Sequence, residues 1–156
     1  MEDLRRPEIF AEYYRMVYQD MYRFALYTLK NPHDAEDVTG EAVMDAYASV
    51  DKLRDPEAFR AWIFTILSNK CKRKLKEYAD KTAELPEQLA SGENMEEGAQ
   101  VRQVFGQLAE EDRMLIAMKV FGGYKSHEIG KMMNMNDNTV RSRISRGMGK
   151  LRELLK

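Results

Sequence analysis

Arginine and serine side chains recur along one stretch of the chain at a spacing suited to binding a polyanion. The segment 138–150, NTVRSRISRGMGK, carries four cations and no acid, and it is long enough for about three to four helical turns. Arginine forms bidentate hydrogen bonds with guanine edges or pairs with phosphates, and serine adds short hydrogen bonds. At about 100° per residue, the residues that share one helical face or flank it are Thr139, Arg141, Ser142, Arg143, Ser145, Arg146 and Gly149. This face predicts a helix that lies in the major groove of DNA.

The opposite side of the same segment is apolar and must face a protein core. Its stripe consists of Val140, Ile144, Met148, Leu151 and Leu155. We therefore expect a helix over residues 137–154, which Asn136 or Asp137 can cap at its start.

A shorter helix is predicted just before it. Ser126 can cap this helix, Met133 ends it, and Asn134 tolerates the left-handed conformation that terminates helices. Gly130 in its middle weakens the helix by about 1 kcal/mol relative to alanine, which a close crossing of two helices would explain. Two helices joined by a turn of about three residues form a helix-turn-helix.

The alternative interpretation of the basic face is a solvated surface, which most runs of charge are. No acid stands between Asp137 and Glu153, and a capped helix and a short turn come directly before the face. These features favour DNA binding.

The rest of the chain predicts helices and almost no strands, so the expected fold class is all-α with two small helical domains. Apolar residues recur at three- and four-residue steps in the first half of the chain. Three helices with short connections, expected at 7–30, 33–49 and 56–78, form a bundle in domain 1–78. An acidic linker follows at 79–97. Domain 98–156 adds a helix through Phe105 and another at about 110–121 before the helix-turn-helix.

Charge is distributed unevenly along a chain whose formal net charge is −1. Residues 77–100 hold seven acids and one lysine, whereas residues 119–156 hold nine cations and three acids. The near-neutral total therefore does not argue against a polyanionic partner. The apolar runs are far shorter than the roughly 20 residues that span a bilayer. The start of the chain does not resemble a secretory signal. A single cysteine fits a reducing compartment. We expect a cytoplasmic protein without membrane insertion.

Two faces of the N-terminal bundle could bind partners. On the second helix, Asp34, Asp37, Glu41 and Met44 lie opposite the apolar stripe and suit a basic helical partner, although a solvated helix face is the alternative. The third helix carries cations beside aromatic residues, which suits single-stranded DNA; the residues concerned are Trp62, Asn69, Lys70, Lys72, Arg73 and Lys74. Core packing is the alternative for Trp62 and Phe59. The loop 49–57 is a candidate pocket for an extruded base.

Other classes of function find less support. An enzyme would draw on Cys71, His33 and His127, which show no ligand spacing, so we expect no catalytic residue, metal or cofactor. Lys70 and Lys72 would lower the pKa of the Cys71 thiol, but a lone thiol in a basic helix is usually incidental. A stand-alone helix-turn-helix regulator stays open as the alternative function. The basic face argues against an adaptor that binds only protein.

Three segments together resemble bacterial sigma factors of the extracytoplasmic-function kind. YKSHEIGKMMNMNDNTVRSRISRGMGKLRELL is similar to their promoter-reading C-terminal domain, NPHDAEDVTGEAVMDAY to their polymerase-clamp segment, and FRAWIFTILSNKCKRKLK to their minus-ten segment. The chain departs from the usual pattern at single positions, which are Gly40, Val43, Arg73, Gly130 and Asn138.

The resemblance implies a function and a set of partners. It implies that the chain binds core RNA polymerase through the second helix and opens the minus-ten element with the N-terminal bundle. It implies that helix 137–154 reads the minus-thirty-five element. The implied partners are core RNA polymerase, promoter DNA in double-stranded and melted form, and an anti-sigma factor.

Overall fold

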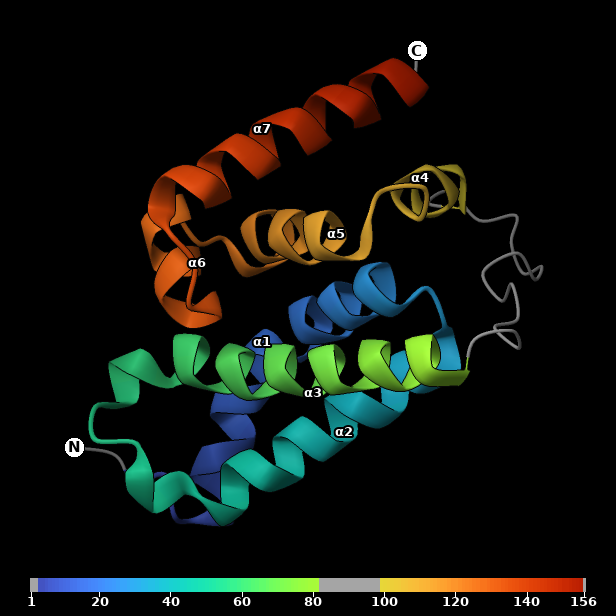
Figure 1. The fold of residues 1–156 in the computed structure, drawn as a ribbon. Coiled ribbons are helices and arrows are strands. Elements are labelled where there is room, and N and C mark those ends of the chain that lie inside the picture. The colour runs from blue at the N-terminus through green and yellow to red at the C-terminus, as the bar shows by residue number, and fades with distance from the viewer. Residues whose placement is uncertain (1–2, 82–98, 156) are drawn as a thin grey trace.

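The computed structural model describes residues 3–81 and 99–155, and every regular element in those ranges is helical. The predicted all-α class is therefore confirmed. The N-terminal half forms a bundle of three long helices, with two short 3-10 turns before the third (Figure 1). These elements are α1 (Pro7–Leu29), α2 (Pro32–Ala48), η1 (Val50–Lys52), η2 (Pro56–Ala58) and α3 (Phe59–Lys81).

Local sequence explains where these helices begin and end. Pro7 stands at the start of α1, where its missing N–H is not needed, and Lys30 ends the helix in the left-handed conformation with φ 63°. The side chain of Asn31 caps α2 by accepting a hydrogen bond from the Asp34 N–H at 3.0 Å. The third helix differs from its predicted range, because η2 occupies the first residues and α3 continues to Lys81.

The C-terminal half contains four helices and a π-helical turn. They are α4 (Ala99–Phe105), α5 (Glu110–Ala117), the turn η6 (Met118–Gly122), α6 (Ser126–Met133) and α7 (Asp137–Leu154). The predicted helix at 110–121 is thus an α-helix that widens into a π-turn. In Figure 1, α7 lies on the side of the molecule away from α2, with α5 and α1 between them.

The two halves share one hydrophobic core. Met21, Phe24 and Phe64 are fully buried in the N-terminal half, and Leu115 and Ile116 are fully buried in the C-terminal half. Truncating a large buried side chain of this kind to alanine costs about 2–5 kcal/mol.

The contact between the halves runs mainly along α1, which packs against α5 and η6. Rings from both halves meet there, with the centroids of Tyr27 and Phe105 4.8 Å apart. No pattern in the sequence predicted this docking.

The acidic linker predicted at 79–97 lies mostly outside the described residues, apart from its first three positions, which belong to α3. Within the described ranges, no helix combines the length and the hydropathy needed to cross a bilayer.

Candidate nucleic-acid and protein interfaces

The helix-turn-helix is built as predicted, except for its first cap. Asn134 ends α6 in the left-handed conformation with φ 58°, and the Asn136 side chain caps α7 by accepting a hydrogen bond from the Asn138 N–H at 2.8 Å. The prediction that Ser126 caps α6 was wrong, since Ser126 is already helical. The cap residue is Lys125, whose N–H donates to the Glu128 carboxylate at 2.8 Å.

Gly130 is required by the turn rather than by a helix crossing. A Cβ at this position would lie 2.7 Å from the carbonyl oxygen of Met135, and the Met135 N–H donates to the Gly130 carbonyl at 2.8 Å. The backbone of the turn therefore folds directly over the middle of α6. A small residue is needed at position 130 as predicted, but the atom that excludes a side chain is the Met135 carbonyl oxygen in the turn and not a crossing helix.

The inner face of α7 follows the predicted stripe except at its end. Val140, Ile144 and Leu151 are buried, whereas Leu155 is 41% exposed, so its assignment to the core was wrong. The stripe fails there because α7 ends at Leu154 and the chain leaves the core. Gly147, which the sequence analysis missed, also faces inward: a Cβ there would lie 2.5 Å from Ile116 Cδ1.

The outer face of α7 presents most of the predicted DNA-binding set to solvent. The exposed members are Thr139, Arg141, Ser142, Ser145 and Arg146. The Arg146 guanidinium donates to Ser142 Oγ at 3.0 Å, and Arg141 pairs with Asp137 at 3.3 Å and bonds to the Asn138 side chain. These contacts orient the side chains within one helix and leave the face open to a ligand.

Arg143 lies apart from that face. Its Nη1 atom is 2.5 Å from Glu111 Oε1 and 3.4 Å from Asp112 Oδ1, both in the first turn of α5. Its side chain is 32% exposed. Arg143, which was predicted to flank the DNA-binding face, therefore joins α7 to α5 instead.

The acidic face of α2 is exposed at three of its four predicted residues. Asp37, Glu41 and Met44 are open to solvent, with Met44 72% exposed. Asp34 instead accepts a hydrogen bond from the Tyr78 hydroxyl of α3. Burial, followed by this hydrogen bond to a carboxylate, raises the pKa of Tyr78.

The start of α2 also offers three groups that could approach one cation. His33, Asp34 and Asp37 can bring one ligand atom each within 4.8 Å of one another. They are exposed or half-buried, and Asp34 already binds Tyr78. Clusters of this kind are common at the first turn of a helix, where acids are favoured by its dipole, so they support no metal assignment.

Basic side chains on α3 divide into two groups. Asn69, Lys72 and Arg73 are exposed, and Lys74 is half-buried. Lys70 is only 11% exposed, and its Nζ lies 2.7 Å from Asp45 Oδ2 and 3.9 Å from Glu41 Oε1 on α2. Lys70 thus holds the two helices together instead of projecting with its neighbours.

The aromatic residues of α3 also divide. Phe59 and Phe64 are core residues, 3% and 0% exposed, whereas Trp62 is half-buried and packs against the edge of the core. Of the three, Trp62 is the one that keeps an accessible surface beside the cations.

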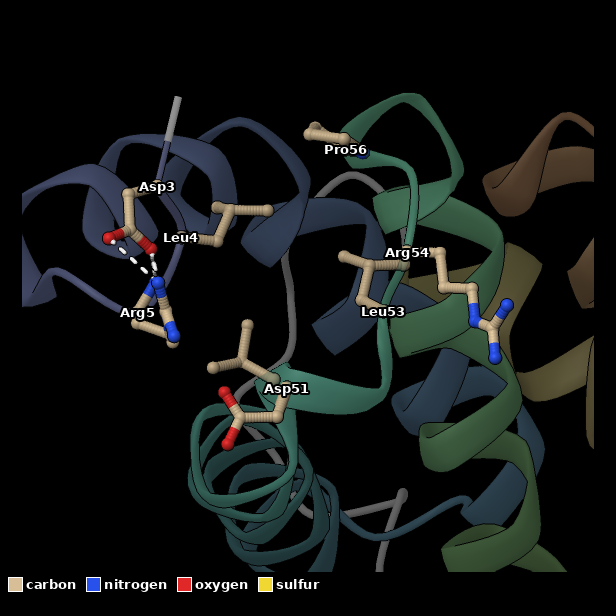
Figure 2. Close-up of a pocket in the computed structure, with 8 residues that line it drawn as sticks. Asp3, Leu4, Arg5, Asp51, Leu53, Arg54 and Pro56 are labelled. Carbon is tan, nitrogen blue, oxygen red and sulfur yellow. Dashed lines mark hydrogen bonds and ion pairs between the residues drawn. The ribbon is translucent and has the colours of Figure 1, made fainter. Parts of the chain in front are cut away.

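A hollow of about 210 Å³ opens between the N-terminal segment and the loop after α2 (Figure 2). It coincides with the predicted pocket in loop 49–57. Arg5 is joined to Asp3 at 3.0 Å on one side, Leu53 lies on the other, and the Arg54 guanidinium points away from both. The N-terminal wall was not foreseen from the sequence.

Cys71 is fully buried, and burial raises the pKa of its thiol. The expectation that Lys70 and Lys72 would lower this pKa was wrong, because the thiol faces the core while Lys72 faces solvent. A protonated, enclosed thiol is neither a nucleophile nor a metal ligand.

Family profiles and curated relatives match both halves of the chain. Residues 9–80 match sigma-70 region 2, and residues 98–151 match sigma-70 region 4. RNA polymerase sigma factor SigV of Bacillus subtilis is 28% identical over 141 residues, which cover 86% of this chain and 83% of that protein. The extracytoplasmic-function sigma factor SigW of the same species is 27% identical, covering 90% of this chain and 86% of that protein.

Two solved structures share the fold over nearly the whole chain. The sigma factor RpoE of Bartonella quintana, solved with the anti-sigma factor NepR, superposes with a TM-score of 0.82 at 22% identity and covers 95% of this chain and 97% of that chain. CnrH, solved with the cytosolic domain of CnrY, gives a TM-score of 0.72 at 24% identity, covering 96% of this chain and 89% of that chain.

Proposed function

This chain belongs to the extracytoplasmic-function group of sigma-70 factors, and we propose that three exposed faces contact its partners. The face on α2 binds RNA polymerase, the face on α3 binds minus-ten DNA and the face on α7 binds minus-thirty-five DNA. The chain is an alternative sigma factor that directs transcription initiation by RNA polymerase. The observation that carries the division is the presence, on one chain, of an acidic face on α2 and basic faces on α3 and α7.

Helix α7 reads the minus-thirty-five element. Arg141 and Arg146 supply hydrogen bonds to base edges or phosphates, and Ser142 and Ser145 add shorter ones. The face is exposed, capped at the turn and free of acids beyond its first residue, which supports this role. Arg143 contributes by fixing α7 on α5.

Helix α3 meets the melted minus-ten element. Lys72, Arg73 and Lys74 contact its phosphates, and Trp62 offers a surface on which a base can stack. The hollow beside Leu53 receives an extruded base, with Asp3 and Arg5 as its second wall. The support for this role is that the hollow lies just before α3 and that exposed cations lie further along the same helix.

Helix α2 binds the polymerase through Asp37, Glu41 and Met44. An exposed methionine between carboxylates suits a basic helix that also offers apolar side chains. Asp34 contributes by anchoring α2 to Tyr78. The domains are those predicted, 1–78 and 98–156 with a linker at 79–97, except that α3 extends the first domain to Lys81. The protein works in the cytoplasm by binding alone, without catalysis. An anti-sigma factor restrains it by covering these faces.

Run-off transcription tests the function. Purified core polymerase and genomic promoter fragments are incubated with and without the protein. Transcripts that start only when it is present support the proposal. A stand-alone regulator would change the yield from promoters served by another sigma factor and start none by itself, and that result would overturn it.

A further inference from the structure

One arginine on the outer face of α7 is held from two sides by residues at the start of the same helix. Nη1 of Arg141 lies 3.3 Å from Oδ2 of Asp137, and Nη2 donates to the side-chain carbonyl of Asn138. The Arg141 side chain is nevertheless 58% exposed. The guanidinium is therefore fixed in direction while it remains open to a ligand.

The two acceptors are themselves held by the turn of the helix-turn-helix. The Asn138 N–H donates at 2.8 Å to the side chain of Asn136, which caps α7. Oδ1 of Asp137 is enclosed by protein and has no hydrogen-bond partner in the part of the chain that the structure describes, so Oδ2 is the oxygen that faces Arg141. A series of contacts thus connects the cap of the helix to the guanidinium.

Arg146 on the same face is held by a single neutral group. Its Nη1 atom donates to Ser142 Oγ at 3.0 Å, whereas Arg141 has both a carboxylate and an amide as acceptors. Hydrogen bonds between a cation and a carboxylate are stronger than neutral ones. The two arginines therefore differ in how much freedom they have before DNA binds.

An arginine that is already oriented discriminates better among bases. A guanidinium has five N–H donors, so three remain for DNA after the bonds to Asp137 and Asn138. Bidentate bonds to a guanine edge require a defined direction, and a side chain that is ordered in advance loses less entropy on binding. Exposed ion pairs add little to fold stability, so the main consequence of these contacts is orientation.

We propose that Asn138 is a positioning residue for promoter recognition. Its side-chain carbonyl orients Arg141 towards one base pair of the minus-thirty-five element and thereby sets the base preference at that pair. Asn138 acts through Arg141 and makes no base contact of its own. The inference rests on the proposed role of α7, and it gives a physical role to one position at which the chain departs from the usual sigma-factor pattern.

Selection from a randomised promoter pool tests this role. Core RNA polymerase carrying the full-length protein is incubated with a promoter found by run-off transcription, in which the minus-thirty-five element is randomised, and the retained templates are sequenced. Arg141→Ala and Arg146→Ala identify the base pair that each arginine reads. Asn138→Ala should reduce the preference at the Arg141 base pair about two- to tenfold, as expected when one long side chain must be ordered on binding. The preference at the Arg146 base pair should not change and serves as the internal control.

Two further variants separate positioning from direct contact. Asn138→Asp keeps an oxygen acceptor for Arg141, so it should retain the preference even though its charge weakens binding to every template. The double variant Asn138→Ala, Arg141→Ala should match Arg141→Ala alone, because Asn138 then has no arginine to orient.

NMR relaxation of the free protein provides a readout without DNA. The order parameter of the Arg141 Nε–H should fall in Asn138→Ala, whereas that of Arg152, near the end of α7, should not change. The urea midpoint should also stay the same, because the substitution keeps the backbone bond to Asn136.

An unchanged base preference, or an unchanged Arg141 order parameter, in Asn138→Ala would overturn the proposal. A further loss of preference in the Arg141→Ala background would overturn it as well, since Asn138 would then read DNA by itself. If Arg141→Ala loses no base preference, the proposal fails with it. If Arg146→Ala loses none either, the role of α7 in reading the minus-thirty-five element also fails.

Discussion

The Nη1 atom of Arg143 on α7 lies 2.5 Å from Oε1 of Glu111 on α5. This ion pair holds Arg143 against α5, whereas Arg141 and Arg146 lie on the exposed outer face of α7. Helical spacing alone placed Arg143 at the flank of the DNA-binding face. Spacing gives the direction of a side chain around its own helix axis, but it does not show that α5 carries acids that can pair with this arginine. The pair therefore predicts that arginines in one short segment differ in their roles.

Arg146→Ala and Arg143→Ala should have different effects on DNA binding and stability. Arg146→Ala should weaken binding to a minus-thirty-five duplex by about 1–3 kcal/mol if the side chain reads a base edge, and should change the free energy of unfolding by less than about 0.5 kcal/mol. Arg143→Ala should lower the free energy of unfolding by up to about 1 kcal/mol, as for an ion pair that is half-buried at the surface. Anisotropy titrations and urea unfolding measure the two quantities. Normal duplex binding by both Arg141→Ala and Arg146→Ala would show that this face does not read DNA.

On α2, Asp37→Lys should weaken the association with core polymerase, because it places a cation on the acidic face. Glu36→Lys makes the same charge change one residue away, where the side chain points elsewhere around the helix, and should leave the association intact. Pull-down of core enzyme compares the two variants. The double variant Asp37→Lys, Glu41→Lys should retain the least polymerase. Equal retention of polymerase by all three, with helix content unchanged, would exclude this face as the clamp contact.

Three glycines in helices should respond differently to alanine. At Gly40 the structure offers open space, so alanine should stabilise the fold by about 0.5–1 kcal/mol. At Gly147 the methyl group meets the flexible end of Ile116, and overpacking should cost about 1–3 kcal/mol. At Gly130 it meets the Met135 carbonyl, so the turn itself must move and the loss should be larger. Urea unfolding ranks the three.

A double variant separates side-chain crowding from backbone crowding. Ile116→Val shortens the side chain that opposes Gly147, so it should recover part of the loss in Gly147→Ala. It should recover none of the loss in Gly130→Ala. Equal unfolding free energies for Gly130→Ala and Gly40→Ala would contradict the close approach of the turn.

These glycines show how far the sequence could lead. Periodicity predicted the helices, the inner stripe of α7 and the helix-turn-helix, because burial of one helical face is a local property of the chain. Gly130 was noticed but misexplained, since a turn carbonyl leaves no pattern in the sequence. Gly147 was missed because its partner Ile116 is distant in sequence. The docking of α1 on α5 and η6 could not be foreseen for the same reason.

Stability should fall at alkaline pH through Tyr124. Burial raises the pKa of Tyr124 to about 12 from its ordinary value of 10.0, and the charged groups that bear on it are Arg60 of α3 and Glu128 of α6. A tyrosine with a raised pKa resists ionisation in the folded state but not in the unfolded state. Its stabilising contribution is therefore complete below pH about 10 and is lost as pH rises towards 12.

Tyr124→Phe should remove that part of the pH dependence. The difference in melting temperature between the unaltered protein and the variant should be constant up to pH about 10 and should change in favour of the variant above it. Tyr78, whose pKa is also raised, is present in both proteins and cancels. A difference that stays constant to pH 12 would show that Tyr124 is not shielded from ionisation.

The salt dependence of single-stranded DNA binding should distinguish Lys70 from Arg73. Each phosphate contact contributes about −0.7 to the slope of log affinity against log salt concentration. Arg73→Ala removes an exposed cation and should reduce the slope by about that amount. Lys70→Ala should leave the slope unchanged, because Nζ is held 2.7 Å from Asp45 and the side chain is 11% exposed. It should instead destabilise the fold by loosening α2 from α3.

Asp45→Asn completes this comparison, because it weakens the hold on Lys70 without removing the lysine. The freed ammonium can then reach a phosphate, so the slope should steepen by up to about 0.7 relative to the unaltered protein. Binding of an oligothymidine, measured by fluorescence anisotropy at several salt concentrations, gives all four slopes. A slope reduced equally by Lys70→Ala and Arg73→Ala would mean that Lys70 leaves Asp45 whenever DNA is bound, and that the ion pair between α2 and α3 does not restrain it.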